Sequence, residues 1–437
     1  MKLGNYDKWF LFFSRGDKAA VAEFRCCLDV PVVPERVKEA VKLALKQFPF
    51  FRLRPFIDSK NDSVIFKENT EEVPVFTDRD NNKDKADKYL YLGSNESNGY
   101  LFSVHVHESD SAVNIIASHV IGDVRAVFFF VRLLIHYYLR LSGCKVDPAL
   151  VPYSEAEAID ERCLETIDDA CMKINTVPDN ADKNPENVFI IPEEAKYAGT
   201  AFTRDFTVIW NNSEMLNAVH ALGTSFLCFV NAVLAEAIYR NYDVGNAVIS
   251  SGVPVDMRAM LNSKSQLNFT RNISLNYEPS YQSISMKEKT QLLRTQLKSK
   301  ITLNNLAAGV NGFSPVLNEV MKLPLTDQVK IFSSMYNSSS KARTFLLSNV
   351  GAVNFPDDMQ AHILDFKMYS TNLEDTPVYV LLSENEDGML LAGQNYDDTK
   401  ILESFCDILK DYGVSAKVID NGKFQCHRLN LEYFSKI

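Results

Sequence analysis

Two hydrophobic periods alternate along the chain and predict strands and helices in turn. Residues 20–30 predict a strand, and Pro34 begins a helical segment with Val37, Val41 and Ala44 on one side. Further strands are expected at residues 50–56, 63–66, 73–76, 100–107, 111–117, 200–210, 247–255, 345–353, 362–369, 378–383 and 388–395. Further helices are expected at residues 154–173, 213–222, 225–239, 284–302 and 400–412. This alternation, with some paired strands, predicts a layered α/β or α+β fold.

The most apolar stretch of the chain is residues 124–141. Arg125, Arg132, His136 and Arg140 follow one another at helical spacing and share one stripe of this helix. Three arginines on one face disfavour a membrane span, because charge inside a bilayer is costly. We therefore expect a buried helix with one solvated edge, and no membrane span.

The chain of 437 residues is long enough for two or three domains. Residues 177–197 contain three prolines, many polar side chains and little periodicity, which is typical of a linker. We expect an N-terminal lobe over residues 1–176, a linker over 177–199 with few core contacts, and a C-terminal lobe over 200–437.

Composition excludes several classes of protein. The net charge of −10 and the isoelectric point of about 5.3 argue against a nucleic-acid partner. The eight cysteines form no Cys-x-x-Cys pair, which favours a reduced cytoplasmic protein over a disulfide framework or zinc module. No secretory leader is recognisable at the N-terminus, so the Asn-x-Ser/Thr triplets at Asn95, Asn268 and Asn272 are interpreted as chance matches.

The segment that suggests chemistry is SHVIGDV, residues 118–124. A strand ends at His119, Gly122 follows in a tight turn, and Asp123 stands where the apolar helix begins and can cap it. A histidine at such a strand end is suited to accept a proton near neutral pH. Taken alone, an H-x-x-x-D pattern is weak, and a loop histidine followed by a capping aspartate is the commoner explanation of it.

Two later segments give this pattern more weight. PVDMR ends a strand with Asp256 and Arg258, and LLSNVG ends another with Ser348 and Asn349. In this order, the three motifs resemble those of the superfamily of chloramphenicol acetyltransferase, peptide-synthetase condensation domains and alcohol or plant acyltransferases. The early segment PERVKEAVKLALKQFPFFRLR resembles the first helix of that family, and the resemblance extends from about residue 24 to residue 409.

The resemblance implies two lobes with a tunnel between them and an acyl transfer from a coenzyme A or carrier-bound pantetheine thioester to an alcohol or amine, as in a bacterial alcohol acetyltransferase. His119 matches the general base of the family, and Asp123 matches a structural aspartate that pairs with Arg258. Ser348 and Asn349 match the strand that lines the tunnel and are candidates for the oxyanion hole. No permanent cofactor and no metal are implied, and the acyl thioester is a co-substrate.

Two departures from the family pattern leave alternatives open. Ser118 precedes His119 where many members have a second histidine, and Val124 follows Asp123 where glycine is usual. The valine motivates a second hypothesis, a catalytically silent binding or interaction protein with the same fold. A third is a stand-alone condensation enzyme that uses carrier-bound donors.

Two other patterns have plain structural interpretations. His105 and His107 share a strand face that could bind a metal, but no ligand partner lies at suitable spacing, so a polar strand face is preferred. The basic residues of the helix at 284–302 could meet donor phosphates, but a solvated helix face is the commoner reason for such a pattern. Those residues are Lys287, Lys289, Arg294, Lys298 and Lys300.

Overall fold

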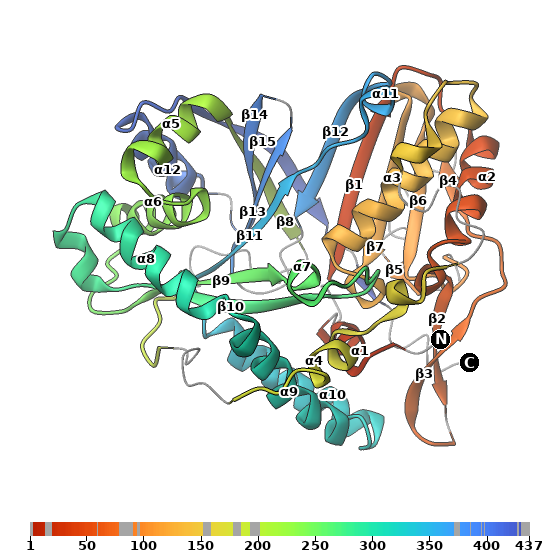
Figure 1. The fold of residues 1–437 in the computed structure, drawn as a ribbon, viewed down its shortest axis with the longest axis horizontal. Helices are drawn as coiled ribbons and strands as arrows, with labels where there is room; N and C mark the ends of the chain where they lie inside the picture. The colour runs from red at the N-terminus through yellow and green to blue at the C-terminus, as the bar shows by residue number, and fades with distance from the viewer. Residues whose placement is uncertain are drawn as a thin grey trace.

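The fold is mixed α/β, as predicted, with two open sheets that each carry helices on their outer side (Figure 1). We analysed a computed structural model of the chain. It describes residues 3–13, 20–58, 60–77, 91–93, 97–151, 159–177, 185–192, 202–370, 376–384, 386–394, 396, 398–425 and 428–429. Most buried apolar side chains fall into two clusters, one centred on each sheet.

The first lobe is built on a five-stranded sheet. In spatial order its strands are β12 (Ile363–Ser370), β1 (Val21–Leu28), β7 (Ala112–Ser118), β6 (Phe102–His107) and β4 (Val75–Thr77). Helices α2 (Pro34–Leu45) and α3 (Val124–Leu141) pack together over one face of this sheet. Phe128 of α3 packs near Phe24 of β1, with ring centroids 6.0 Å apart. Burial of this apolar face stabilises the lobe and fixes where α3 begins.

The second lobe is built on a seven-stranded sheet. Its order is β10 (Thr270–Tyr277), β9 (Ile249–Asp256), β11 (Phe345–Ala352), β13 (Val378–Glu384), β14 (Asp387–Gln394), β8 (Phe202–Asn211) and β15 (Ala416–Gln425). Helices α5 (Asn212–Leu222), α6 (Phe226–Asn241), α8 (Met286–Lys300) and α12 (Lys400–Lys410) lie on its outer side (Figure 1). Short elements complete the chain: β2 (Leu53–Asp58) with β3 (Ser63–Glu68), β5 (Tyr91–Leu92) with β16 (Arg428–Leu429), α7 (Arg258–Leu261) and α11 (Asp357–Gln360).

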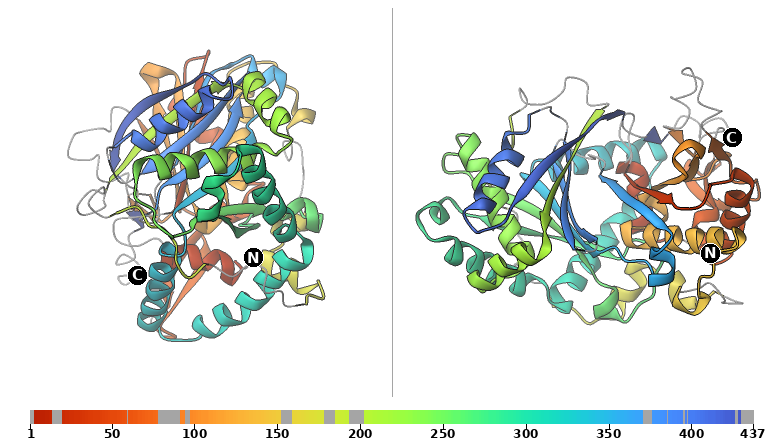
Figure 2. Two further views of the ribbon diagram at one scale, coloured as in Figure 1. Left: turned by 90° about the vertical axis from the view of Figure 1, so that its left-hand side faces the viewer. Right: turned by 90° about the horizontal axis from the view of Figure 1, so that it is seen from above.

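The two lobes are joined by more than one crossing of the chain. Strand β12 comes from the second half of the sequence but pairs antiparallel with β1 along its length, from Ala22 opposite Ser370 to Leu28 opposite Ile363. The inner face of the second sheet also contributes to the core of the first lobe, through Val380. The right-hand view of Figure 2 shows the two sheets side by side. The lobe boundaries at residues 176 and 200 stay a prediction. Strand β12 follows these boundaries in the sequence but belongs to the sheet of the first lobe.

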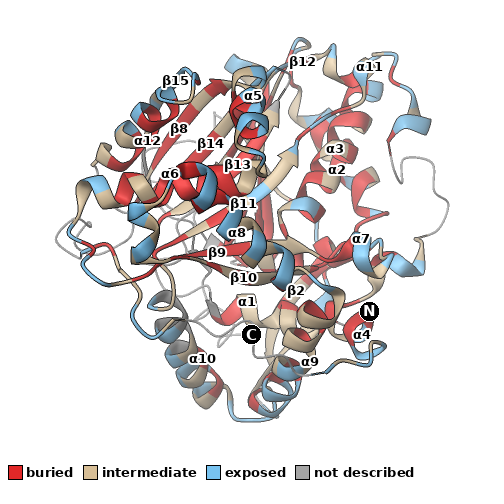
Figure 3. Cartoon of the chain, turned by 60° about the vertical axis from the view of Figure 1, so that its left-hand side comes forward, coloured by how far each residue is buried: buried red, intermediate tan, exposed pale blue. Residues whose placement is uncertain are grey.

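A helical layer lies below both sheets in Figure 1. It contains α1 (Asn5–Phe13), α4 (Ile167–Met172), α9 (Leu303–Val320) and α10 (Leu325–Ser340). Trp9 of α1 packs on Phe313 of α9 with ring centroids 4.4 Å apart, and Phe12 stacks on Phe332 of α10 at 4.6 Å. Figure 3 shows that the far side of α10 is exposed. None of α1, α9 or α10 was predicted from the hydrophobic pattern, and neither were β10 and β15.

Two other expectations are wrong. The helix expected at 154–173 is interrupted: a 3-10 turn at Glu161–Leu164 ends before Thr166, whose side chain caps the short α4. His136 does not lie on a solvated edge of α3, because its side chain is fully buried. Neither of its ring nitrogens has a hydrogen-bond partner in the described part of the chain, and burial, with the charge of Arg140, lowers its pKa to about 4.

The linker expected to make few core contacts is also packed where it is described, over residues 185–192. Val188 forms a bridge with Val248, and the N–H of Phe189 donates to the carbonyl of Val248 at 2.9 Å. Ile191 is 1% exposed in the core of the second lobe. This part of the segment belongs to the second lobe and is not a free connection.

No single described helix is long and apolar enough to cross a membrane. Taken together, α5 and α6 reach the required length and composition, but the two helices are bent by 90° relative to each other.

Candidate active site

The end of β7 positions His119 through its main chain. The side chain of Ser118 accepts from the N–H of Val120, and the N–H of His119 donates to the carbonyl of Ala20 in the neighbouring segment at 2.8 Å. The turn then passes Gly122, where an added Cβ would lie 2.9 Å from the Cβ of Ala126. Only glycine fits this close approach, so the turn delivers the next residue directly to the start of α3.

Asp123 is buried and accepts four hydrogen bonds. One carboxylate oxygen caps α3 by accepting from the N–H of Ala126 at 3.0 Å, and the other accepts from the N–H of Phe269 at 3.0 Å. Arg258 donates to both oxygens, from Nη1 at 2.9 Å and from Nη2 at 3.0 Å. Burial alone would raise the pKa of Asp123, but the charge and hydrogen bonds of Arg258 outweigh it and hold that pKa below its usual value.

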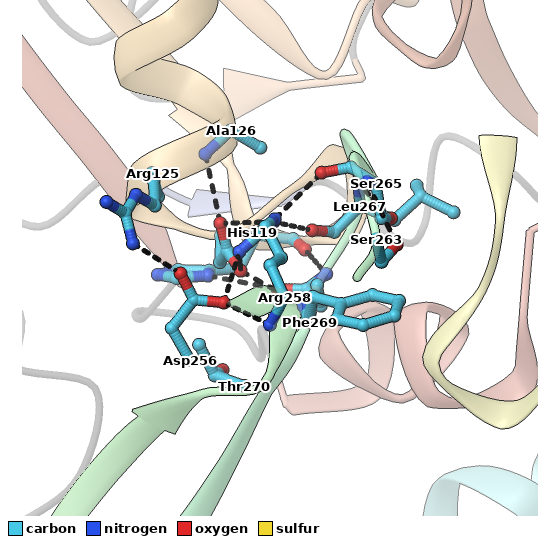
Figure 4. A network of polar contacts seen from close by, with 12 residues as sticks. His119, Arg125, Ala126, Asp256, Arg258, Ser263, Ser265, Leu267, Phe269 and Thr270 are labelled. Carbon is cyan, nitrogen blue, oxygen red and sulfur yellow. Dashed lines mark hydrogen bonds and ion pairs between the residues drawn. The ribbon is translucent and has the colours of Figure 1, made fainter. Parts of the chain in front are cut away.

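Arg258 is itself enclosed, with 7% of its surface exposed. Its Nε donates to the carbonyl of Ser265 at 2.8 Å and its Nη2 to that of Leu267 at 2.6 Å. Asp256 accepts from Arg258 at 3.1 Å and, through its other oxygen, from the exposed Arg125 at 2.6 Å (Figure 4). The pair therefore ties the start of α3 in the first lobe to the loop after β9 in the second.

The ring of His119 is half-buried and held from two sides. Its Nδ1 lies 3.4 Å from Oδ1 of Asn268, and the ring of Phe10 stacks on it with centroids 5.2 Å apart and planes 21° apart. Burial lowers the pKa of His119, and the negative charge of Asp123 and the hydrogen bond to Asn268 oppose this without reversing it. His119 is therefore neutral at neutral pH, the form that can accept a proton.

Asp7, Phe10 and Asn268 were not predicted from the sequence as site residues. Asn268 matched only an Asn-x-Ser/Thr triplet. Asp7 and Phe10 are one helical turn apart near the N-terminus, and a pattern of that length does not say which distant loop it will contact. A possible signal was the apolar run around Trp9, which is typical of a helix that packs on something.

Ser348 and Asn349 lie in β11, opposite Val380 and Leu381 of β13. Asn349 is exposed, and its side-chain oxygen accepts from the N–H of Gly351 at 3.2 Å. Within the described part of the chain, no hydrogen bond or ion pair joins either side chain to His119 or Asp123. The structure thus brings together His119, Asp123 and Arg258, and leaves these two residues on the neighbouring sheet without a direct bond to them.

The remaining candidates are engaged locally. The ring of His105 contacts the hydroxyl of Ser103 at 2.9 Å and stacks on Phe76 at 5.0 Å. The solvated face expected for the lysine-rich helix is wrong at two positions of α8, because Lys289 is buried in an ion pair with Glu236 and Lys300 is buried as well. Within the described ranges, no group of three or more metal-ligating side chains is close enough to hold a metal ion.

Val124 is the first residue of α3 and stands where the motif of the resembled family usually has glycine. That side chain is half-buried and packs partly against the core of the first lobe. A valine is therefore accommodated at this position by packing of the apolar helix, and its presence leaves the Asp123–Arg258 pair intact.

Comparison with known proteins gave matches in structure only. No protein-family model matches the chain, and no curated protein matches its sequence. Polyketide synthase associated protein 5 from Mycobacterium tuberculosis has a TM-score of 0.60 at 14% identity, over 94% of this chain and 96% of that one. TRI101 of F. sporotrichioides, crystallised with coenzyme A and T-2, has a TM-score of 0.58 at 10% identity, over 96% and 99% of the two chains.

A third match is the epimerization domain from the third module of tyrocidine synthetase B, with a TM-score of 0.59 at 10% identity over 94% of both chains. At such low identity these matches establish architecture and not activity. They span nearly the whole chain and include a protein crystallised with coenzyme A and a domain of a peptide synthetase. The chain therefore shares its overall fold with these three proteins.

Proposed function

We propose that the protein is an acyltransferase that moves an acyl group from a thioester of coenzyme A, or of carrier-bound pantetheine, to an alcohol or amine. The observation that carries the proposal is the neutral, half-buried His119 beside the buried Asp123–Arg258 pair. The fold supports it, since the similar TRI101 structure holds coenzyme A. Free thiols at the described cysteines suit a reducing compartment, and we place the reaction in the cytoplasm.

In the proposed reaction His119 is the general base. Its free ring nitrogen takes the proton of the acceptor hydroxyl or amine as that atom attacks the thioester carbonyl. The tetrahedral intermediate then collapses, the carbon–sulfur bond breaks, and the proton held by His119 passes to the departing thiolate. The enzyme returns to its starting state without a covalent intermediate.

The remaining residues hold this base in place. Asp123 accepts only from Arg258 and main-chain N–H groups in the described contacts, so we assign it a structural role. We propose that the substrates meet in a tunnel between the lobes. Ser348 and Asn349 are our candidates for the oxyanion donor, and loss of the true donor would lower kcat by about 10²–10³.

The test is release of free thiol from acetyl-CoA in the presence of a panel of alcohols and amines, with wild type and His119→Ala compared. We expect a rate above background for at least one acceptor in the wild type and none in the variant. Equal rates in both proteins across the panel would refute His119-dependent transfer from free acetyl-CoA.

Two other functions remain as alternatives. A catalytically silent relative would bind its ligand without transfer, and Val124 at the start of α3 motivates this hypothesis. A stand-alone condensation enzyme would show no turnover with free coenzyme A thioesters but would react with donors loaded on a carrier protein. Repeating the panel with acyl-loaded carrier protein separates the two.

A further inference from the structure

Helix α1 reaches the candidate base through a chain of side chains that the proposed reaction does not use. Asp7 and Phe10 are three residues apart and therefore share one face of α1. Phe10 stacks on the ring of His119, and Asp7 contacts Asn268, which in turn contacts His119. The base is thus held by a helix at the start of the chain and a loop after β9.

The hydrogen-bond partners of Asn268 fix the orientation of its amide group. Its Nδ2 donates to Oδ1 of Asp7 at 3.0 Å and to the carbonyl oxygen of His119. Burial raises the pKa of Asp7 to about 7, but its Oδ1 also accepts from the main-chain N–H of Asn268 at 3.1 Å and therefore acts as an acceptor in either protonation state. The carbonyl oxygen of His119 can only accept, so the two amide hydrogens must face these two oxygens. The amide oxygen of Asn268 then faces Nδ1 of His119, at 3.4 Å. A flipped amide would set oxygen against two other oxygens.

The orientation of Asn268 determines the tautomer of His119. An amide oxygen accepts, so Nδ1 must carry the hydrogen in the neutral ring. Nε2 then keeps its lone pair and is the nitrogen free to accept a proton from an acceptor substrate. In a serine protease triad the wrong tautomer of the catalytic histidine costs about 10⁴ in rate, which shows how much such a choice can matter.

Asp7 fixes which way the side-chain amide of Asn268 points. Its side chain is completely buried and accepts from the N–H of Gly4 and from the main-chain and side-chain nitrogens of Asn268. A buried carboxylate held by neutral donors is costly for folding. A group that only filled space there would be apolar. The position of the carboxylate is explained if its task is to orient the Asn268 amide.

We propose that Asn268 and Asp7 are positioning residues that hold His119 as the Nδ1–H tautomer, with Nε2 exposed to substrate. The role rests on the proposed function of His119 as base. The tautomer itself is a property of the resting protein and can be measured without turnover.

The first experiment is ¹⁵N NMR of protein labelled at histidine, with His119 assigned by the signals lost in His119→Asn. Above the pKa of His119, we expect a pyrrole-type Nδ1 and a pyridine-type Nε2 in the wild type. In Asn268→Leu, which keeps the approximate shape but not the hydrogen bonds, the ring should shift toward the Nε2–H tautomer. An Nε2–H tautomer in the wild type, or no change in the variant, would overturn the proposal.

Two variants of Asp7 test the contact between Asp7 and Asn268. Asp7→Leu removes the acceptor and should shift the tautomer in the same direction as Asn268→Leu. Asp7→Asn keeps an acceptor oxygen and should restore at least part of the wild-type signal. Both remove a buried charge and are expected to fold. Identical spectra for Asp7→Leu and wild type would exclude Asp7 from the positioning role.

Kinetics provide the functional readout. Asn268→Leu should lower kcat about tenfold or more with KM within about twofold, as is typical when a residue that orients a functional histidine is lost. It should also move the acid limb of kcat/KM to lower pH, because the hydrogen bond from Nδ1 to Asn268 raises the pKa of His119. The titratable and charged groups in this region are Asp123 beside His119, Arg258 paired with Asp123, Asp7, whose pKa is raised to about 7 by burial, and Asp168 beside Asp7. All four are kept in Asn268→Leu.

The matched control is Asn231→Leu. Asn231 is a buried asparagine of α6 that donates to Ser251, away from His119. It should lose stability without moving the acid limb. If Asn268→Leu behaves like this control, its role is structural only. If the wild type shows the Nδ1–H tautomer but transfers no acyl group, the proposed function fails and the positioning of His119 stands.

Discussion

Arg258 donates to both carboxylate oxygens of Asp123, from Nη1 at 2.9 Å and from Nη2 at 3.0 Å. Both residues are buried, with 7% and 4% of their surface exposed. They come from different lobes and are 135 positions apart in the sequence. Because Asp123 also caps α3, this one ion pair sets the start of the helix that follows His119. Rigid bidentate geometry of this kind fixes orientation more firmly than a single hydrogen bond does.

Loss of Arg258 should therefore be severe. Arg258→Ala leaves the carboxylate of Asp123 buried without a cation, and we expect a loss of about 3–5 kcal/mol in the free energy of unfolding. Denaturant unfolding followed by circular dichroism measures it. The matched control is Arg125→Ala, which removes an ion pair with Asp256 in which Arg125 is exposed and should cost about 1 kcal/mol or less. Equal losses in the two variants would contradict a larger contribution of the buried Asp123–Arg258 pair to stability.

Gly122 should not tolerate a methyl group. A Cβ there meets the Cβ of Ala126 at 2.9 Å and the main-chain oxygen of Gln266 at 3.1 Å. Gly122→Ala is expected to destabilise by about 1–3 kcal/mol through overpacking. Gly312→Ala, in α9 with no atom within 4 Å, should be neutral or stabilising. A Gly122→Ala protein as stable as wild type would show that the turn yields easily.

The pH profile of the reaction should reflect the lowered pKa of His119. Burial is the main cause of the shift, and it disfavours the protonated ring. The ring then stays neutral to lower pH than an ordinary histidine with a pKa of 6.5, so the acid limb of kcat/KM should be centred below pH 6.5. The assay is confined to pH values at which circular dichroism reports a folded protein. An acid limb centred above pH 6.5 would contradict a desolvated base.

His136 should make the protein sensitive to acid for a different reason. Its pKa falls from 6.5 in the unfolded chain to about 4 in the fold, so between these values only the unfolded chain takes up the proton. Stability is therefore highest above pH 6.5 and is lost as the pH falls toward 4, by about 3 kcal/mol from this group.

Thermal unfolding across pH measures this effect. His136→Leu should flatten the acid side of the profile, and it also removes two buried ring nitrogens that lack partners in the described chain. His220→Gln, at an exposed position of α5, is the control and should leave the profile unchanged. An unaltered acid slope in His136→Leu would assign the acid sensitivity to other groups.

Local patterns in the sequence predicted most of the elements and the order of the motifs. The boundaries expected for the apolar helix at 124–141 are those of α3, and the sheet strands at 345–353 and 378–383 lie close to β11 and β13. Burial of His136 was missed because helical spacing gives the stripe a residue belongs to, and not what packs over that stripe. The exchange of β12 into the first sheet depends on pairing over several hundred residues, which no local period encodes.

The site residues were likewise predicted only in part. His119 and Asp123 lie within one motif, and the resemblance to the family implied that Arg258 pairs with Asp123. Asn268 was missed because its role depends on a carboxylate 261 positions away, on a helix without a clear periodic signal. Short polar side chains such as asparagine carry no information in sequence about which partner they meet.

Transfer of a labelled acyl group tests the central claim most directly. Wild type and His119→Ala are incubated with an isotopically labelled acetyl thioester and the best acceptor of the panel, and the labelled ester or amide is quantified by mass spectrometry. The account predicts labelled product from the wild type and a fall of at least about 10² in its rate in the variant, as expected for loss of a general base. Product formed at equal rates by the two proteins would contradict it.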